Sequence, residues 1–340
     1  MTPDRFHEIS RRYPHLRIAV LGDFCLDRYL EIDPDKAETS IETGRPVHNV
    51  TRVRFQPGGA GTILNNLAAL GIGEIIPIGF CGPDAEGHEL HEALAARKGV
   101  NLNHFLCTPE RRTFTYCKPL LMHPGKEPEE LNRLDFKNWS PTPDTVTQLL
   151  IDMLETVMAD VAAVIVLDQV DEAETGVVTR PLLRAIGRLA KSHPETFFIG
   201  DSRRGFTGWP AISYKMNEAE FRRFTDSDDE DIRSLLPKLG AAARRSHRPS
   251  FVTRAENGIV SMAADETVFE ESALPTKEAI DIVGAGDAVS ANLTAALAAG
   301  ATPAEAAFIA NRAASVVVHK IGTTGTATVA EIKPLIQGDA

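Results

Sequence analysis

Short apolar runs alternate along this 340-residue chain with longer stretches in which apolar residues recur every three or four positions. The first kind of segment is typical of a buried strand, and the second predicts an amphipathic helix. A glycine that closes a periodic stretch, as Gly71 does, adds a helix stop signal. The predicted strands lie within 17–23, 74–82, 162–168, 196–205 and 251–262, and the predicted helices lie within 61–71, 85–100, 288–300 and 302–322.

Strands that alternate with helices indicate a mostly parallel sheet covered by helices on both faces. We therefore expect an α/β fold in a single domain that spans residues 1–340. Two polar, strand-like segments, 24–56 and 111–122, interrupt the alternation. We expect these two segments to form a small β lid outside the main sheet.

Acidic residues follow three of the apolar runs, at Asp23, Asp168 and Asp201. In open α/β sheets, ligands bind beyond the carboxyl ends of the strands. The stretch DIVGAGDAV (281–289) would lie on the same rim. Position is the only argument for Asp168, and we do not predict it to be catalytic.

DIVGAGDAV places an acid directly behind two glycines, at the predicted start of a helix. Gly284 and Gly286 permit backbone conformations closed to other residues and let a ligand approach the main chain. Unpaired amides at a helix start attract phosphate, and Asp287 would hold a carboxylate beside that anion. This arrangement suits phosphoryl transfer, in which amides stabilise charge and a carboxylate accepts a proton. Taken alone, the stretch also fits a glycine turn in which Asp287 caps the helix.

Two other nucleotide-binding motifs are absent from the sequence. No G-x-G-x-x-G follows an early strand, and no G-x-x-x-x-G-K-[ST] occurs. Neither a Rossmann site nor a P-loop is therefore predicted.

The formal charge of -11 argues against a broad nucleic-acid surface, which would need a basic stripe. No apolar run approaches the roughly 20 residues needed to cross a bilayer, and the first residues lack the apolar core of a signal peptide. We therefore expect a cytoplasmic protein without nucleic-acid or membrane partners. The four cysteines show no C-x-x-C spacing, which favours reduced thiols over a zinc site.

Two pairs of polar residues carry weaker predictions. His88 and His91 share a helix face but lack a third metal ligand, so we expect them on an exposed face. Arg111 and Arg112 fit either a contact to a substrate phosphate or an ordinary surface charge.

Three motifs occur in the order that is found in the ribokinase-like (PfkB) sugar kinases. PGGAGTILNNLAALG (57–71), NEAE (217–220) and DIVGAGD (281–287) resemble the family's Gly-Gly loop, its N-x-x-E motif and its D-T-x-G-A-G-D motif. The chain resembles this family over nearly its whole length. Within the family, the closest resemblance is to the kinase domain for D-glycero-D-manno-heptose 7-phosphate, and it is carried by GDFCLDRYL (22–30), RPVHNV (45–50), RLDF (133–136), VTRAENG (252–258) and ANRAASVVVHKIGTTGTATV (310–329).

The resemblance implies a ribokinase-like three-layer fold and transfer of phosphate from ATP, with Mg²⁺, to a sugar hydroxyl. It implies that Asp287 is the catalytic base and that the backbone of Gly284, Ala285 and Gly286 forms the anion hole. It also implies a lid that closes over the sugar and makes a homodimer contact. The other implied contacts are Asp27, Gly58 and Gly59 with the sugar, Asn217 and Glu220 with Mg²⁺ through water, Thr253, Arg254, Gly258 and Asn311 with the nucleotide, and Asp281 and the carbonyl of Val283 with a monovalent cation such as K⁺.

Several positions depart from the family pattern. Thr62 stands where the heptose kinases usually carry Asn, and it offers one hydroxyl in place of a donor and an acceptor. Ile282 replaces the usual Thr of the late motif. The loop DQVDEAE (168–174) lacks the subgroup's Lys, and GDSRRG (200–205) presents Arg203 where the subgroup has V-D-P-K-G. We therefore predict Thr62 and Arg203 as acceptor contacts, and an altered sugar.

The sequence thus predicts an ATP-dependent carbohydrate kinase that acts on a sugar or sugar phosphate, with heptose 7-phosphate among the candidates. The same fold also suits fructose, ribose or a nucleoside as the acceptor. A non-catalytic sensor of sugar or nucleotide is a further alternative, which the joint presence of Asp287, Asn217 and Glu220 disfavours.

Overall fold

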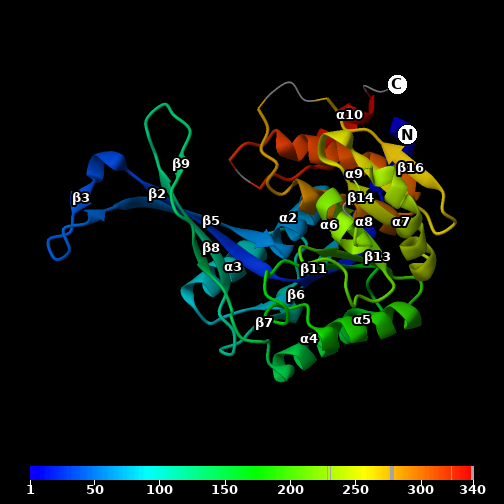
Figure 1. Ribbon diagram of the computed structural model, residues 1–340, viewed down its shortest axis with the longest axis horizontal. Helices are drawn as coiled ribbons and strands as arrows, with labels where there is room; N and C mark the ends of the chain where they lie inside the picture. Colours follow the sequence, from blue (N-terminus) through cyan, green and yellow to red (C-terminus); the bar gives the residue numbers. More distant parts are fainter. Residues whose placement is uncertain (228, 230, 276–278, 323, 338–340) are drawn as a thin grey trace.

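The computed structural model describes residues 1–227, 229, 231–275, 279–322 and 324–337. A body of sheet and helices carries a long β arm, which projects from one side (Figure 1). In the described residues, no helix has the length and apolar character needed to span a membrane. The alternation of strands and helices predicted from the sequence is confirmed, and the arm contains both predicted lid segments.

The main sheet has nine strands in the described part of the chain, and its centre is parallel. Only the edge formed by the last two strands is antiparallel. Strands β14 (Ser250–Thr253) and β15 (Ile259–Met262) form an antiparallel hairpin in the region 251–262, where the sequence predicted strand structure. In spatial order the strands are β16 (Val268–Glu271), β15 (Ile259–Met262), β14 (Ser250–Thr253), β13 (Ser213–Asn217), β12 (Phe197–Ser202), β11 (Ala163–Asp168), β1 (Arg17–Gly22), β6 (Glu74–Cys81) and β7 (Phe105–Cys107).

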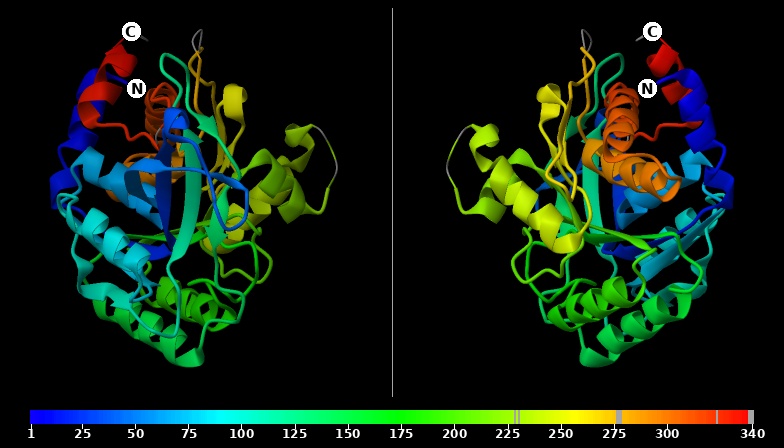
Figure 2. Two further views of the ribbon diagram at one scale, coloured as in Figure 1. Left: turned by 90° about the vertical axis from the view of Figure 1, so that its left-hand side faces the viewer. Right: turned by 90° about the vertical axis from the view of Figure 1, so that its right-hand side faces the viewer.

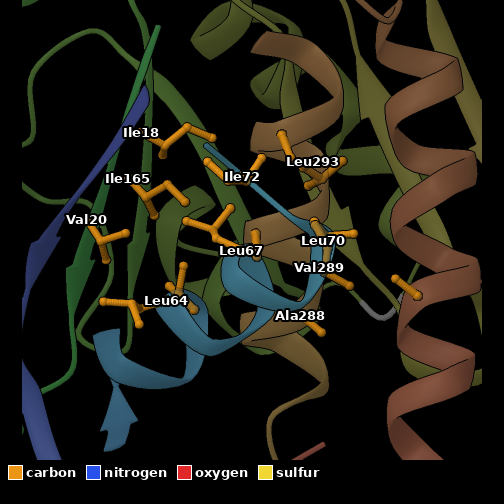
Figure 3. Packing of buried hydrophobic residues seen from close by; sticks show 14 of the residues in the cluster. Ile18, Val20, Leu64, Leu67, Leu70, Ile72, Ile165, Ala288, Val289 and Leu293 are labelled. Carbon is orange, nitrogen blue, oxygen red and sulfur yellow. The ribbon is translucent and has the colours of Figure 1, made fainter. Parts of the chain in front are cut away.

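Strand β1 shows why both faces of this sheet are buried. Ile18 and Val20 point into one hydrophobic core, whereas Ala19 and Leu21 point into the other. Successive side chains of a strand alternate between faces, so a run that is apolar at every position needs helices on both sides. Figure 3 shows the first of these cores, where side chains from strand β1 meet those of two helices.

Two layers of helices supply these cores and lie on opposite sides of the sheet (Figure 2). The helices that pack in the first core are α1 (Pro3–Ser10), α2 (Ala60–Leu70), α3 (Ala85–Ala95), α8 (Ala285–Ala298), α9 (Pro303–Val318) and α10 (Val329–Gln337). The other layer consists of α4 (Asp144–Val157), α5 (Arg180–Ser192), α6 (Glu218–Thr225) and α7 (Ile232–Ser246). Single 3-10 turns occur at Tyr13–His15, Pro34–Lys36, Leu102–His104 and Ala255–Asn257.

The arm is a second, smaller sheet that serves as the lid. Its strands in spatial order are β10 (Leu134–Phe136), β8 (Phe114–Leu121), β2 (Phe24–Ile32) and β5 (Val50–Gly59), with β9 (Glu129–Glu130) beside β8 and a hairpin of β3 (Glu38–Thr39) and β4 (Pro46–Val47) at the tip. The sequence did not predict β9 and β10, because β9 is a pair of glutamates and β10 is only three residues long. The lid therefore extends to residue 136.

Helix α3 (Ala85–Ala95) contacts strands β2 and β5 and supports the base of the lid. Asp84 caps its start by accepting a hydrogen bond from the amide of Gly87 at 2.8 Å. The helix ends five residues before the predicted boundary at 100. The chain turns there, and Gly99 takes a positive φ of 81° that an L side chain would resist.

Candidate active site

The carboxyl ends of strands β12 and β13 meet the start of helix α8. Asp201, at the end of β12, is buried, and its Oδ2 accepts a hydrogen bond from Lys215 Nζ of β13 at 2.9 Å. The same oxygen accepts a 2.7 Å hydrogen bond from Ser290 Oγ of α8. One carboxylate thus joins both strands to the helix that carries Asp287. The predicted convergence of acids and DIVGAGD on one rim is therefore confirmed for Asp201.

Gly284 makes the turn that the sequence predicted at the start of α8. It has a φ of 82° and occupies the N-cap position of the helix. A Cβ on this residue would lie 3.4 Å from a methyl carbon of Thr62 and 3.3 Å from that of Thr324. Both the dihedral angle and the close packing therefore favour glycine here.

The amides of this turn divide into two groups. The Ala285 amide donates to the Ile282 carbonyl at 3.2 Å, and the Ala288 amide makes the first bond of the helix ladder, to Gly284. Among the described residues, no acceptor is recorded for the amides of Gly284, Gly286 and Asp287. Free amides at the N-terminus of a helix form a site for an anion. The amides of Gly286 and Asp287 are therefore better placed to bind an anion than the amide of Ala285. The family resemblance had implied Ala285 as part of the anion hole, but its amide already donates within the turn.

Asp287 lies in the first turn of α8 and is half-buried. Burial raises the pKa of its carboxyl to about 7, and the neighbouring carboxylates of Asp201 and Asp27 add to the rise. The cations of Lys215 and Arg203 oppose it. A carboxylate with a pKa near neutrality is suited to accept a proton during a reaction.

Lys215 is a site residue that sequence reasoning did not single out. Its ammonium is buried beneath the DIVGAGD turn, and a Cβ on Gly286 would lie only 3.1 Å from Nζ. Burial acts to lower the pKa of Lys215, but the carboxylates of Asp201, Glu220 and Asp287 raise it, so the side chain carries a charge. The available signal was a lysine inside the otherwise buried strand SYKMN.

Asn217 and Glu220, the N-x-x-E pair, form the capping box of helix α6. Asn217 Oδ1 accepts from the Glu220 amide at 2.8 Å, and Glu220 Oε2 accepts from the Asn217 amide at 2.8 Å. Burial raises the pKa of Glu220, and the Asp201 carboxylate raises it further. Because the single side-chain oxygen of Asn217 and one of the two carboxylate oxygens of Glu220 already accept hydrogen bonds, the pair fits Mg²⁺ as an outer layer that binds its waters. No group of three or more His, Cys, Asp and Glu residues in the described chain forms a direct metal site.

On the lid, Asp27 faces the site from strand β2. It is buried, and its Oδ1 lies 3.6 Å from Lys118 Nζ of strand β8. A Cβ on Gly58 would lie 2.8 Å from Asp27 Oδ2, so this glycine leaves room for the acid. A Cβ on Gly59 would lie 2.5 Å from the carbonyl oxygen of Asp23. Asp27 also contributes to the raised pKa of Asp287. The two acids therefore lie close enough to interact across the space between lid and body.

A hydrogen bond joins the lid to Thr324, in the loop that lies beside the DIVGAGD turn. Gln56 Nε2 of strand β5 donates to Thr324 Oγ1 at 2.5 Å, and the methyl group of Thr324 faces Gly284. Thr62 faces the same glycine from helix α2 and is buried. The methyl of Thr62 thus packs against the turn, and its role as an acceptor contact stays a prediction.

Arg203 is exposed and pairs with Asp171 at 3.7 Å. It lies close enough to Asp287 to lower the pKa of that carboxyl, so it is placed near the site. Its neighbour Arg204 differs, because it binds both oxygens of the buried Asp168 at 2.8 Å. Asp168 is therefore half of a structural ion pair, in keeping with the prediction that it is not catalytic.

Three of the residues predicted for the nucleotide lie at the β14–β15 hairpin, and the fourth, Asn311, lies in helix α9. Thr253 Oγ1 donates to the Met216 carbonyl at 3.3 Å, and Arg254 pairs with Glu218 at 3.1 Å. Asn311 is buried in α9 and donates to the Ser272 carbonyl at 2.5 Å. These contacts fix the side chains, and their roles toward ATP stay predictions.

Two further predicted positions lie at turns. Gly258 has a φ of 84°, and a Cβ there would lie 1.9 Å from the Glu271 carbonyl oxygen, so the hairpin needs glycine. Asp281 uses both carboxylate oxygens, with Oδ1 accepting from the Val283 amide at 3.0 Å and Oδ2 accepting from the Gly322 amide at 3.1 Å. This residue ties the site turn to the loop after α9, and cation binding at Asp281 and Val283 stays a prediction.

The weaker predictions have mixed outcomes. Both alternatives for Arg111 are wrong, because its buried guanidinium donates to the carbonyls of Ser140, Pro141 and Thr175 and holds two loops together. His91 is exposed on α3, as expected. The cysteines are free thiols, of which Cys25, Cys81 and Cys117 are buried and Cys107 is exposed.

Comparison with known proteins agrees with this geometry. Residues 212–329 match the model of the pfkB family carbohydrate kinases. Two curated relatives are both named Bifunctional protein HldE. The protein from Halorhodospira halophila is 32% identical over 95% of this chain and 64% of its own length. The protein from Magnetococcus marinus is 31% identical over 93% of this chain and 63% of its own length. The chain thus spans a little under two thirds of these relatives.

Among solved structures, the ribokinase of Arabidopsis thaliana complexed with ribose and ATP superposes with a TM-score of 0.69. The match covers 95% of this chain and 98% of that one at 17% identity. The protein therefore has the ribokinase-like fold. The family match shows a pfkB family carbohydrate kinase domain within residues 212–329, and the two relatives align with nearly the whole chain.

Proposed function

We propose that the protein transfers the γ-phosphoryl group of ATP to a hydroxyl of a sugar or sugar phosphate. One observation carries the proposal. The raised-pKa carboxylate of Asp287 lies beside free amides at the start of α8, with Asp27 of the lid facing it. The sequence resemblance to heptose kinase domains makes D-glycero-D-manno-heptose 7-phosphate the first acceptor to test.

In this mechanism the acceptor hydroxyl binds between the lid and Asp287. Asp287 removes the hydroxyl proton as the oxygen attacks the γ-phosphorus in line with the bond to ADP. The amides of Gly286 and Asp287 stabilise the negative charge on the transferring group. Asp27 orients the sugar by accepting from its hydroxyls, and the lid excludes water from the reaction.

Asn217 and Glu220 are the residues that would hold Mg²⁺, through its waters. When bound with ATP, the ion neutralises charge on the phosphate oxygens. Thr253, Arg254, Gly258 and Asn311 would border the nucleotide. Asp281 and the Val283 carbonyl would hold a monovalent cation, which a comparison of activity in potassium and sodium salts tests.

The proposal is tested by measuring ADP release over a panel of acceptors. The panel holds heptose 7-phosphate, fructose, ribose, a nucleoside, and phosphorylated counterparts of the simple sugars. We expect one acceptor class to stimulate ADP release and to appear as a phosphorylated product. Tight binding of ATP and sugar without ADP release from any acceptor would instead point to a sensor.

We also propose that the lid pairs two copies of the chain. Strand register puts Val53, Phe55 and Leu134 on the lid face opposite Asp27. Their side chains are 41%, 38% and 54% exposed, which is unusual for apolar residues that share one face. Burial of this face against a second copy would remove the apolar area from water.

Light scattering after size exclusion tests the pairing. We expect a dimer from the unmodified chain and a monomer from a Val53→Glu/Phe55→Glu variant. The control is Leu149→Glu on helix α4, which is 44% exposed and far from the lid. A monomer from the unmodified chain, or an unaltered dimer from the double variant, would contradict the proposal.

A further inference from the structure

Lys215 is a buried ammonium with unused hydrogen-bonding capacity. Its side chain is 6% exposed, and Asp201 Oδ2 at 2.9 Å is the one acceptor recorded for Nζ among the described residues. An ammonium carries three N–H donors, so two of them lack a recorded partner. A buried donor without a hydrogen-bond partner costs free energy of folding, so we expect such a group to bind a ligand.

The position of this ammonium coincides with the anion site. Gly286 brings the backbone close to Nζ, since a Cβ at that residue would lie 3.1 Å away. The amides of Gly286 and Asp287, which have no recorded acceptor in the described chain, belong to the same turn. A helix N-terminus and a buried cation thus offer positive charge to one point from two different elements.

We propose that Lys215 is a catalytic residue whose ammonium contacts the transferring phosphoryl group together with the amides of Gly286 and Asp287. This inference rests on the proposed kinase function. In the transfer, the acceptor O–H bond breaks and its proton passes to Asp287, while a bond forms between the acceptor oxygen and the γ-phosphorus. The bond from that phosphorus to the bridging oxygen breaks, and its electron pair leaves with ADP. Lys215 keeps its protons throughout and supplies charge only.

The competing explanation is that Lys215 only neutralises Asp201, because a buried carboxylate without a partner would destabilise the site. The two roles separate in a double variant. Lys215→Met leaves Asp201 charged and without its ion-pair partner, whereas Asp201→Asn/Lys215→Met removes both charges together. Ser290 Oγ remains as a hydrogen-bond partner for the new amide. The double variant therefore leaves the net charge of the site unchanged, even where the single Lys215→Met chain fails to fold.

The experiment compares Asp201→Asn/Lys215→Met with Asp201→Asn, so that the lysine is the only difference. Lys191→Met, on the exposed face of α5, controls for loss of a lysine elsewhere. Turnover is measured with the acceptor found in the panel, and ATP and ADP affinities are measured by calorimetry. We expect the double variant to lose roughly 10²–10³-fold in kcat relative to Asp201→Asn, as when one oxyanion donor is removed. We also expect its affinity for ATP to fall more than its affinity for ADP.

The result that would overturn this role is a double variant within tenfold of Asp201→Asn in kcat, with an unchanged preference for ATP over ADP. Failure of the proposed function gives a different pattern, in which the unmodified chain phosphorylates no acceptor. In that case the calorimetric ATP preference alone decides the role of Lys215. A preference that is lost with the lysine supports the phosphoryl contact, and a preference that persists refutes it.

Discussion

Replacing Asp287 with Asn should remove activity and stabilise the fold at the same time. The pKa of this carboxyl rises from its ordinary value of 3.8 to about 7 in the folded protein. An acid with a raised folded-state pKa stabilises the fold only while it is protonated. That stability is fully present below about pH 4 and is lost as the pH rises through about 7. At higher pH the ionised Asp287 therefore costs stability, and an Asn at this position does not.

The size of this effect follows from the shift. One pKa unit corresponds to about 1.36 kcal/mol, so the whole rise of about three units amounts to about 4 kcal/mol. Asp287 is only half-buried, and solvent screening reduces the figure, so we expect a gain of about 2 kcal/mol near pH 8. Near pH 5 the carboxyl is protonated in the fold, and the gain should shrink to below about 1 kcal/mol.

Urea unfolding of both proteins at the two pH values measures this gain. Asp152→Asn, on the exposed side of helix α4, is the matched control and should show no gain that depends on pH. The activity of Asp287→Asn should fall by several orders of magnitude in the ADP-release assay. A variant that is less stable than the unmodified chain near pH 8, or a gain that is equal at both pH values, would refute the electrostatic reasoning.

Three further predictions concern the pH profile, the hairpin turn and the capping box. Since Asp287 must be ionised to accept a proton, kcat/KM should fall about tenfold per pH unit below about pH 7, and a flat profile down to about pH 5 would exclude Asp287 as the base. Gly258→Ala should cost at least about 2 kcal/mol in urea unfolding, because its Cβ would lie 1.9 Å from the Glu271 carbonyl oxygen. Gly44→Ala is the control, because Gly44 has a φ of 65° and a Cβ there would have no atom within 4 Å. This control should lose only about 1 kcal/mol of stability, from backbone strain. Equal losses of stability in the two variants would contradict a steric clash at Gly258. Glu220→Gln can keep the capping box, so the stability of this variant should stay the same while the Mg²⁺ concentration for half-maximal activity rises. Glu220→Ala should show the same rise and should also lose about 1 kcal/mol of stability. An unchanged Mg²⁺ requirement in both variants would rule out the role of Glu220.

Local patterns in the sequence were sufficient to predict the fold class, most strands of the main sheet, and helices α2, α3, α8 and α9, but not the other described helices. The alternation of apolar runs and periodic stretches identified the parallel sheet and helices α8 and α9, because those signals depend on near neighbours. The lid strands β9 and β10 were missed, since segments of two or three residues are too short to show a strand period. Helix α3 was extended too far because Gly99, near its predicted end, was not read as a stop.

The candidate site was predicted less completely than the fold, because local patterns reveal only the part of the site that is contiguous in the sequence. Asp287 and its glycines form one contiguous motif, so their geometry could be anticipated from the sequence. Lys215 belongs to the site only because strands β12 and β13 are adjacent, which no local pattern reveals. Arg111 was misjudged because an arginine inside a polar loop gives no sign of burial against three carbonyls.

The central claim is that Asp287 is the base of an ATP-dependent sugar kinase. Its most direct test is phosphorus NMR of ATP incubated with the acceptor panel, run in parallel for the unmodified chain and for Asp287→Asn. We predict that the unmodified chain converts ATP to ADP and one new phosphoester, and that the variant binds ATP but forms no phosphoester over the same time. Equal phosphoester formation by both proteins would contradict the role of Asp287, and its absence from both would contradict the kinase.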